Sequence, residues 1–99
     1  MLVHAVFIWL KDDLSQADRQ KFIDGVQSLK MIAGSEGCYV GVPASTNRPV
    51  IDRSYDYGLT ILFKDMAAHD RYQVDPIHTT FLRECSPLWK KVLIYDPQE

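Results

Sequence analysis

The start of the chain is apolar on two alternating sets of positions. Residues 2–10 are rich in β-branched and aromatic side chains. Leu2, Val6, Ile8 and Leu10 fall on one side with His4, and Val3, Ala5, Phe7 and Trp9 fall on the other. This pattern predicts a buried strand. A helix can cover one of its faces, so a second structure must cover the other.

The next segment has the pattern of an amphipathic helix. Ser15 is a typical N-cap residue, and Asp18 three positions later resembles the second half of a capping box. The apolar residues that follow recur at intervals of three and four: Phe22, Ile23, Val26 and Leu29. We therefore predict a helix with one apolar stripe, and Gly34 is a plausible stop signal.

Three further strands are indicated. Residues 37–42 form a short one that two glycines weaken, and residues 54–64 and 89–95 form longer ones. The strand at 54–64 should place these side chains on one face: Tyr55, Tyr57, Leu59, Ile61 and Phe63. Residues 43–49 are rich in turn formers, so we expect a surface loop there, either a lid or a connection.

Between the last two strands the chain predicts two consecutive helices. Asp65 caps a helix that runs to about Gln73, and Asp75 followed by Pro76 opens the next one. His78 then lies in the first turn of the second helix. It shares a face with apolar residues at spacings of three and four: Phe81, Leu82 and Cys85.

The order strand, helix, strand, strand, helix pair, strand predicts an α+β ferredoxin-like sandwich. Such a fold has a four-stranded antiparallel sheet with helices on one face. A chain of 99 residues has room for one domain, spanning residues 1–99. The uncovered sheet face would be unusually apolar, so we expect a homodimer that stacks two sheets.

Composition narrows the possible partners. The net charge of −2 and the scattered basic residues argue against nucleic acid. The apolar start is too short to span a bilayer, so we expect no membrane segment. Cys38 and Cys85 match no metal or redox spacing, which favours free thiols and a cytoplasmic location.

Tyr72 and His78 are the candidates for proton chemistry. The positive end of a helix dipole favours a neutral imidazole, which can accept a proton, and a nearby tyrosine hydroxyl can donate one. The same two residues also fit a simpler interpretation, as hydrogen-bonded residues at the edge of the core. A metal site made of His4, His78 and Asp96 is a further alternative, but the spacing is poor and we expect no metal or other cofactor. His69 is expected to be an exposed helix residue.

Together these features resemble the stress-responsive A/B barrel (Dabb) family. The resemblance covers almost the whole chain and rests on His4 in the first strand, Ser15, the Tyr55-Asp56 pair, the Tyr72–His78 segment and the closing 92–96 segment. It implies a ferredoxin-like subunit that dimerises through its sheet into an α+β barrel. The chain is similar to the olivetolic acid cyclase branch, in which a tyrosine and a histidine carry out a cofactor-free aldol condensation.

This resemblance implies roles for individual residues. Tyr72 and His78 match the catalytic pair, and His4 and Asp96 match polar pocket residues, either of which would orient the His78 ring. Asp75 and Tyr57 stand where the cyclase has histidines. The implied function is cofactor-free cyclase-like chemistry on a small hydrophobic or aromatic compound, bound between helices and sheet. The alternatives are a non-catalytic stress-associated oligomer or ligand carrier, and a cofactor-free monooxygenase in which Trp9 and Tyr57 line an aromatic pocket.

Overall fold

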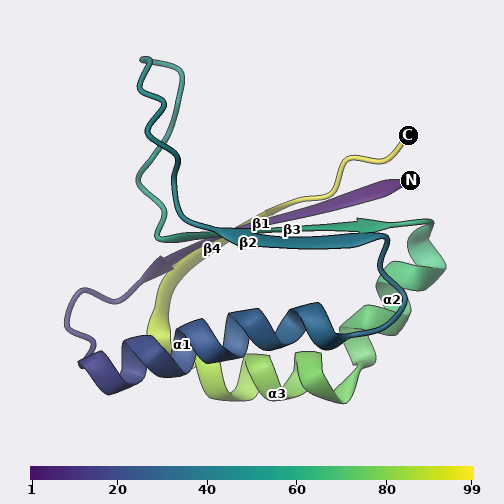
Figure 1. The fold of residues 1–99 in the computed structure, drawn as a ribbon, viewed down its shortest axis with the longest axis horizontal. Coiled ribbons are helices and arrows are strands. Elements are labelled where there is room, and N and C mark those ends of the chain that lie inside the picture. Colours follow the sequence, from purple (N-terminus) through teal and green to yellow (C-terminus); the bar gives the residue numbers. More distant parts are fainter.

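The computed structural model describes residues 1–99 and contains four strands and three α-helices (Figure 1). The strands are β1 (Leu2–Leu10), β2 (Gly37–Gly41), β3 (Tyr57–Phe63) and β4 (Trp89–Tyr95). The helices are α1 (Gln16–Ser28), α2 (Met66–Val74) and α3 (Pro76–Cys85). Short 3-10 turns follow α1 at Leu29–Met31 and α3 at Ser86–Leu88. None of the helices has the length and apolar character that a membrane span requires.

The strands form one antiparallel sheet in the order β2-β3-β1-β4. All three α-helices lie on the same side of it, with α1 beside α3 (Figure 1). This arrangement is the predicted ferredoxin-like α+β fold. The central strand β1 pairs with both β3 and β4, so residues near the start, middle and end of the chain meet on one surface.

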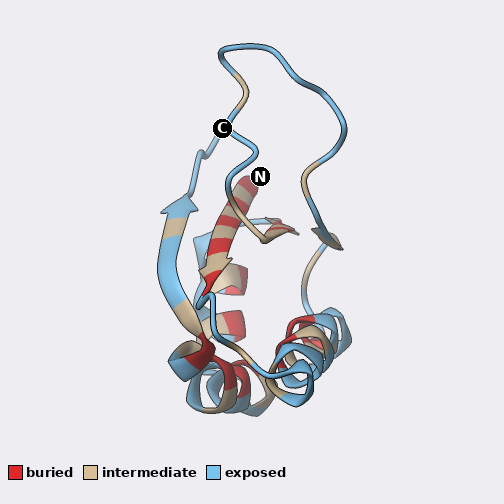
Figure 2. Cartoon of the chain, turned by 90° about the vertical axis from the view of Figure 1, so that its left-hand side faces the viewer, coloured by how far each residue is buried: buried red, intermediate tan, exposed pale blue.

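The two faces of β1 differ in burial as its pattern predicts. Every second residue from Leu2 to Leu10 is buried, His4 included, while the residues between them are only partly buried. Figure 2 shows this alternation as red and tan bands along the strand. The buried face packs on the helices, whereas the outer face meets no other layer. The outer face also carries strongly exposed aromatic residues, among them Tyr39 and Tyr95.

The predicted helix caps are all present. The Ser15 hydroxyl accepts from the Asp18 N–H at 3.0 Å. The Asp65 carboxylate accepts from the Ala68 N–H at 2.9 Å, and the Asp75 carboxylate accepts from the Ile77 N–H at 2.9 Å. Each cap satisfies a donor that the helix itself leaves unpaired, which fixes where α1, α2 and α3 begin.

Two details differ from the sequence prediction. The strand β3 begins at Tyr57, because the Asp56 carboxylate accepts the Leu10 N–H at 2.7 Å and interrupts the regular ladder. Tyr55 therefore turns to the outer face and packs edge-on against Phe7, with ring centroids 5.1 Å apart. The connection between β2 and β3 is thus longer than predicted, and Figure 1 shows it extending away from the sheet on the side opposite the helices.

The end of α1 is the second difference. The helix ends at Ser28 and tightens into the 3-10 turn Leu29–Met31, so Gly34 lies beyond it. Gly34 has a φ of 97°, a left-handed conformation that suits glycine in the turn leading into β2.

Candidate active site

A cavity of about 170 Å³ lies between the inner face of the sheet and the helices α2 and α3. Its polar groups come from β1, α2 and α3, and its remaining wall is apolar. It is lined by His4, Val6, Ile8, Leu29, Leu59, Tyr72, Gln73, His78, Phe81, Leu82, Trp89, Val92 and Ile94. Leu82, Val92 and Ile94 are also partly exposed, so the cavity opens between α3 and the edge strand β4 through an apolar mouth.

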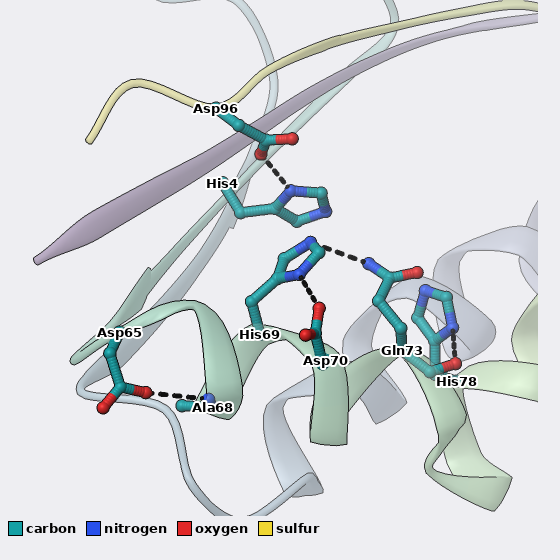
Figure 3. Close-up of polar contacts among 8 residues, drawn as sticks. All are labelled: His4, Asp65, Ala68, His69, Asp70, Gln73, His78 and Asp96. Atoms are coloured by element: carbon teal, nitrogen blue, oxygen red, sulfur yellow. Dashed lines mark hydrogen bonds and ion pairs between the residues drawn. The ribbon is translucent and has the colours of Figure 1, made fainter.

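The break between α2 and α3 fixes the orientation of His78. In a continuous helix the Gln73 carbonyl would accept from the Ile77 N–H, four residues on. Here the Asp75 carboxylate takes that N–H instead. The free Gln73 carbonyl lies 3.1 Å from Nδ1 of His78, and Figure 3 shows the imidazole held beside the end of α2. The main chain at Gln73 orients this ring, and not Asp96 or His4 as expected from the sequence.

This contact also determines the state of the imidazole. A carbonyl oxygen only accepts, so Nδ1 of His78 carries a proton and donates it, which leaves the lone pair on Nε2. Burial lowers the pKa of His78 below its ordinary value of 6.5, and His4 and His69 lower it further. The bond to Gln73 and the charge of Asp75 act in the opposite direction. At neutral pH the ring is therefore an uncharged base.

Tyr72 stands next to His78 on the cavity wall. Their ring centroids are 4.8 Å apart, with the ring planes tilted by 55°. Burial raises the pKa of Tyr72 well above its ordinary value of 10, so the phenol keeps its proton. No hydrogen bond within the chain occupies its hydroxyl, and no fully buried polar side-chain atom lacks a partner, so the hydroxyl oxygen is not fully buried. Tyr72 and His78 thus line the same cavity.

A cluster of polar side chains, His4, His69 and Asp96, lies at the sheet side of the cavity. Nδ1 of buried His4 is 2.5 Å from a carboxylate oxygen of Asp96, just after β4. The His4 ring meets the His69 ring edge-on at a centroid distance of 5.2 Å. Nδ1 of His69 is in turn 3.1 Å from Asp70 (Figure 3). His78 is not part of this group, so the structure does not assemble the His4, His78 and Asp96 cluster that was considered as a metal site.

The other two residues proposed for the pocket lie elsewhere. Trp9 is an odd-numbered residue of β1 and lies on the outer face, where its indole N–H donates to the Ser54 hydroxyl at 3.0 Å. Tyr57 faces the helices but packs on Phe22 of α1, at a ring-centroid distance of 5.2 Å. Neither one lines the cavity that contains Tyr72 and His78.

Two contributors were missed in the sequence. Gln73 acts through a main-chain carbonyl, which every residue has, so its side chain carries no signal. His69 precedes Tyr72 by three positions, a spacing that places both on one side of a helix. Since Tyr72 was expected to face the sheet, that spacing indicated the same orientation for His69. Its side chain is only 17% exposed.

The fold and cavity define a ferredoxin-like α+β protein with a small, partly open site between its sheet and helices. The model of the stress-responsive A/B barrel domain (Dabb) matches residues 2–98, so the chain belongs to this family. No curated protein matches the sequence.

Solved structures with the same fold include one from the same family. A Dabb family protein from Mesorhizobium loti is 28% identical, with a TM-score of 0.77 over 99% of this chain and 95% of that chain. A dimeric ferredoxin-like protein of unknown function from Jannaschia is 21% identical, with a TM-score of 0.79 over 99% and 98% of the two chains. A hydroxynitrile lyase from Passiflora edulis is 20% identical, with a TM-score of 0.76 over 97% and 90%. Because the last two structures are only 20–21% identical to this chain, their similarity shows a shared fold and nothing more.

Proposed function

We propose that this protein is a homodimer that binds a small carbonyl compound in the cavity and moves protons on it without a cofactor. His78 acts as the general base and Tyr72 as the hydrogen-bond donor to the reacting oxygen. The single observation that carries this assignment is that His78, whose Nε2 the Gln73 carbonyl leaves unprotonated, lies beside Tyr72 on the cavity wall, with ring centroids 4.8 Å apart.

The reaction class follows from these two groups. His78 takes a proton from the carbon next to a carbonyl, and the electron pair moves onto the carbonyl oxygen, where the Tyr72 hydroxyl stabilises the enolate. In an aldol step the enolate carbon attacks a second carbonyl and forms a C–C bond. The new alkoxide then takes back the proton that His78 holds. Protons balance, and no oxidant or reductant is consumed.

The cavity limits the size of the substrate. Its volume of about 170 Å³ is close to the roughly 150 Å³ that accommodates a benzene ring in a protein interior. The apolar mouth favours an uncharged compound, and the few polar groups favour one or two oxygen atoms. We therefore expect a monocyclic, aromatic or short polyketide-like carbonyl compound.

The assembly follows from the uncovered side of the sheet. The outer face of β1 is apolar, and within the subunit only the segment around Tyr55 packs on part of it, a feature more typical of interfaces than of a monomer's surface. The dimeric relative from Jannaschia supports the same conclusion. Stacking two sheets would give the α+β barrel implied by the family resemblance, and each subunit would keep its own cavity on the helical side.

A ligand carrier is the second candidate, and the predominantly apolar wall of the cavity favours it. Such a carrier would bind the same compounds without turnover. Proton abstraction separates the two functions directly, because a catalytic base exchanges the hydrogen next to a carbonyl with solvent.

The experiment is deuterium exchange of monocyclic ketones and β-keto esters in D2O, followed by NMR, with binding measured in parallel by calorimetry. We expect wild type to exceed the buffer rate and His78→Gln to lose about 100-fold or more of the acceleration. Tyr72→Phe should be similarly impaired, and the double variant should be little worse than either single one, because both residues serve one step. Tyr57→Phe, outside the cavity, is the matched control.

Three outcomes can be distinguished. Exchange that depends on His78 and Tyr72 supports the enzyme. Binding that Phe81→Ala weakens, without exchange above the buffer rate, supports the carrier. If neither binding nor exchange responds to changes at His78, Tyr72 or Phe81, the cavity is not the functional site.

A further inference from the structure

The group formed by His4, His69 and Asp96 has a feature that the chemistry at His78 does not use. One imidazole nitrogen from each histidine and one carboxylate oxygen of Asp96 lie within 4.8 Å of one another. They come from β1, α2 and the segment after β4, so only the folded chain brings them together. The burial is graded, with His4 buried, His69 intermediate and Asp96 exposed, which leaves a path from solvent.

The hydrogen bonds of the two rings show which nitrogens a metal ion could use. A carboxylate only accepts, so His4 donates its Nδ1 proton to Asp96 and His69 donates its Nδ1 proton to Asp70. The Gln73 amide lies 3.4 Å from Nε2 of His69, in the position of a donor to its lone pair. This contact is long, so Nε2 of His69 is the unprotonated nitrogen that a metal ion could take once it displaces the Gln73 amide. A carboxylate on the opposite nitrogen, here Asp70, is how metal-binding histidines are held.

We propose that His4, His69 and Asp96 form a binding site for one divalent transition-metal ion per chain. The ion takes the place of the proton between Nδ1 of His4 and the Asp96 carboxylate, so its ligands are this nitrogen, an Asp96 oxygen and Nε2 of His69, and one proton is released. Two histidines and one carboxylate suit zinc, iron(II), cobalt(II) or nickel(II), whereas magnesium and calcium prefer all-oxygen sites.

The required rearrangement is small. Ligand atoms bound to one such ion are at most about 4 Å apart, because each metal–ligand bond is about 2 Å long. The present spacing of up to 4.8 Å is that of open, ligand-free side chains. Asp96 is 41% exposed and can move by this amount without disturbing the core, and His69, which is 17% exposed, has only to leave the Gln73 amide. The ion would lie at the sheet side of the cavity, because His4 is in its wall.

The test uses the full-length protein without an affinity tag, after treatment with EDTA. Cobalt(II) is titrated while its visible absorption is recorded, and zinc is titrated by calorimetry. We expect one ion per chain, with magnesium failing to compete. His69→Gln and Asp96→Asn should each weaken binding by about 10–100-fold. His78→Gln should bind the metal as wild type does, because this ring lies outside the cluster.

The result is independent of any turnover by His78 and Tyr72, because the readout is metal affinity. If wild type binds neither ion at micromolar concentrations, the site does not exist. Equal affinity in wild type and His69→Gln would place any bound ion elsewhere. Should His69→Gln fold poorly, as judged by circular dichroism, the exposed Asp96→Asn variant decides by the same criterion.

Discussion

The main-chain oxygen of Gln73, near the end of α2, lies 3.1 Å from Nδ1 of His78 in the first turn of α3. The contact exists because the two helices are separate. Asp75 takes the N–H that would otherwise bind this oxygen, and Pro76 has no N–H to offer. The break between α2 and α3 therefore frees the Gln73 carbonyl to orient the proposed catalytic base.

Replacing the cap tests this relationship. Asp75→Ala should lower the free energy of unfolding by about 1 kcal/mol, because the Ile77 N–H loses its partner. That N–H can then turn to the Gln73 carbonyl and compete with His78, so ligand affinity or exchange in the cavity should fall as well. Urea denaturation and the deuterium-exchange assay measure the two effects.

Asp65→Ala is the matched control. This residue caps α2 in the same manner, so its loss should cost a similar free energy of unfolding. Its cap lies at the far end of α2 from His78, so the cavity should keep its activity. Equal losses of activity in both variants would mean that Asp75 acts through stability alone.

The lowered pKa of His78 gives a second prediction, on pH dependence. The folded protein binds the proton of His78 less readily than the unfolded chain, whose histidine titrates near 6.5. As the pH falls below 6.5, the unfolded state therefore binds more protons than the folded state. The free energy of unfolding should then decrease as the pH falls from 6.5 toward the lower pKa of His78 in the folded protein. For the same reason, the acid limb of any activity profile should lie below 6.5.

NMR titration of the His78 ring measures the pKa directly, and denaturation at pH 7.5 and 5.5 measures the linkage. In His78→Gln the decrease in stability over this range should be smaller than in wild type, because one titrating group is gone. A His78 pKa at or above 6.5 in the folded protein would contradict the assignment of a buried neutral base.

The sequence predicts most of the fold because the relevant signals are local. Caps at Ser15, Asp65 and Asp75 depend on side chains within three residues, and the two faces of β1 depend on alternation alone. Tyr55 departs from its predicted face because Asp56 interrupts the ladder through a contact with Leu10, 46 positions away in sequence. No local pattern contains that contact.

The candidate site is harder to predict from the sequence, because several of its contacts join residues that are far apart in the chain. The proximity of Tyr72 and His78 could be inferred from the helix break between them. The contact of His69 with His4 joins two elements through tertiary packing, and the role of Gln73 belongs to its backbone. The position of Trp9, by contrast, could be predicted. Trp9 and His4 are an odd number of residues apart on β1, so their side chains lie on opposite faces of the strand and cannot line the same cavity.

The outer face of the sheet gives a third prediction. Leu93 pairs with Phe7 in the β1–β4 register and both belong to the outer face. We expect wild type to be a dimer in light scattering at micromolar concentration, and Leu93→Asp to be a folded monomer, because stacking would bury its charge. Thr80→Asp, on the exposed side of α3, should remain dimeric. A monomeric wild type would contradict the stacked-sheet assembly.

The contact between α1 and α3 gives the last prediction. A Cβ atom added at Gly25 would lie 2.5 Å from Sγ of Cys85 and 3.3 Å from the ring of Phe81, a residue of the cavity wall. Alanine in a helix interior gains roughly 1 kcal/mol over glycine, whereas overpacking a filled core costs about 1–3 kcal/mol. Cys85 is fully buried and cannot move aside, so we expect the overpacking to dominate and Gly25→Ala to be destabilising.

A double-mutant cycle identifies the cause. Cys85→Ala removes the sulfur that the new methyl group meets, so Gly25→Ala should cost less in that background than in wild type. Since the remaining contact is with Phe81, the single variant should also weaken ligand binding in the cavity by displacing α3. If Gly25→Ala is neutral or stabilising in urea denaturation and the two substitutions are additive, α1 and α3 are not packed as closely as the structure has them, and the position of His78 above the cavity would need to be redetermined.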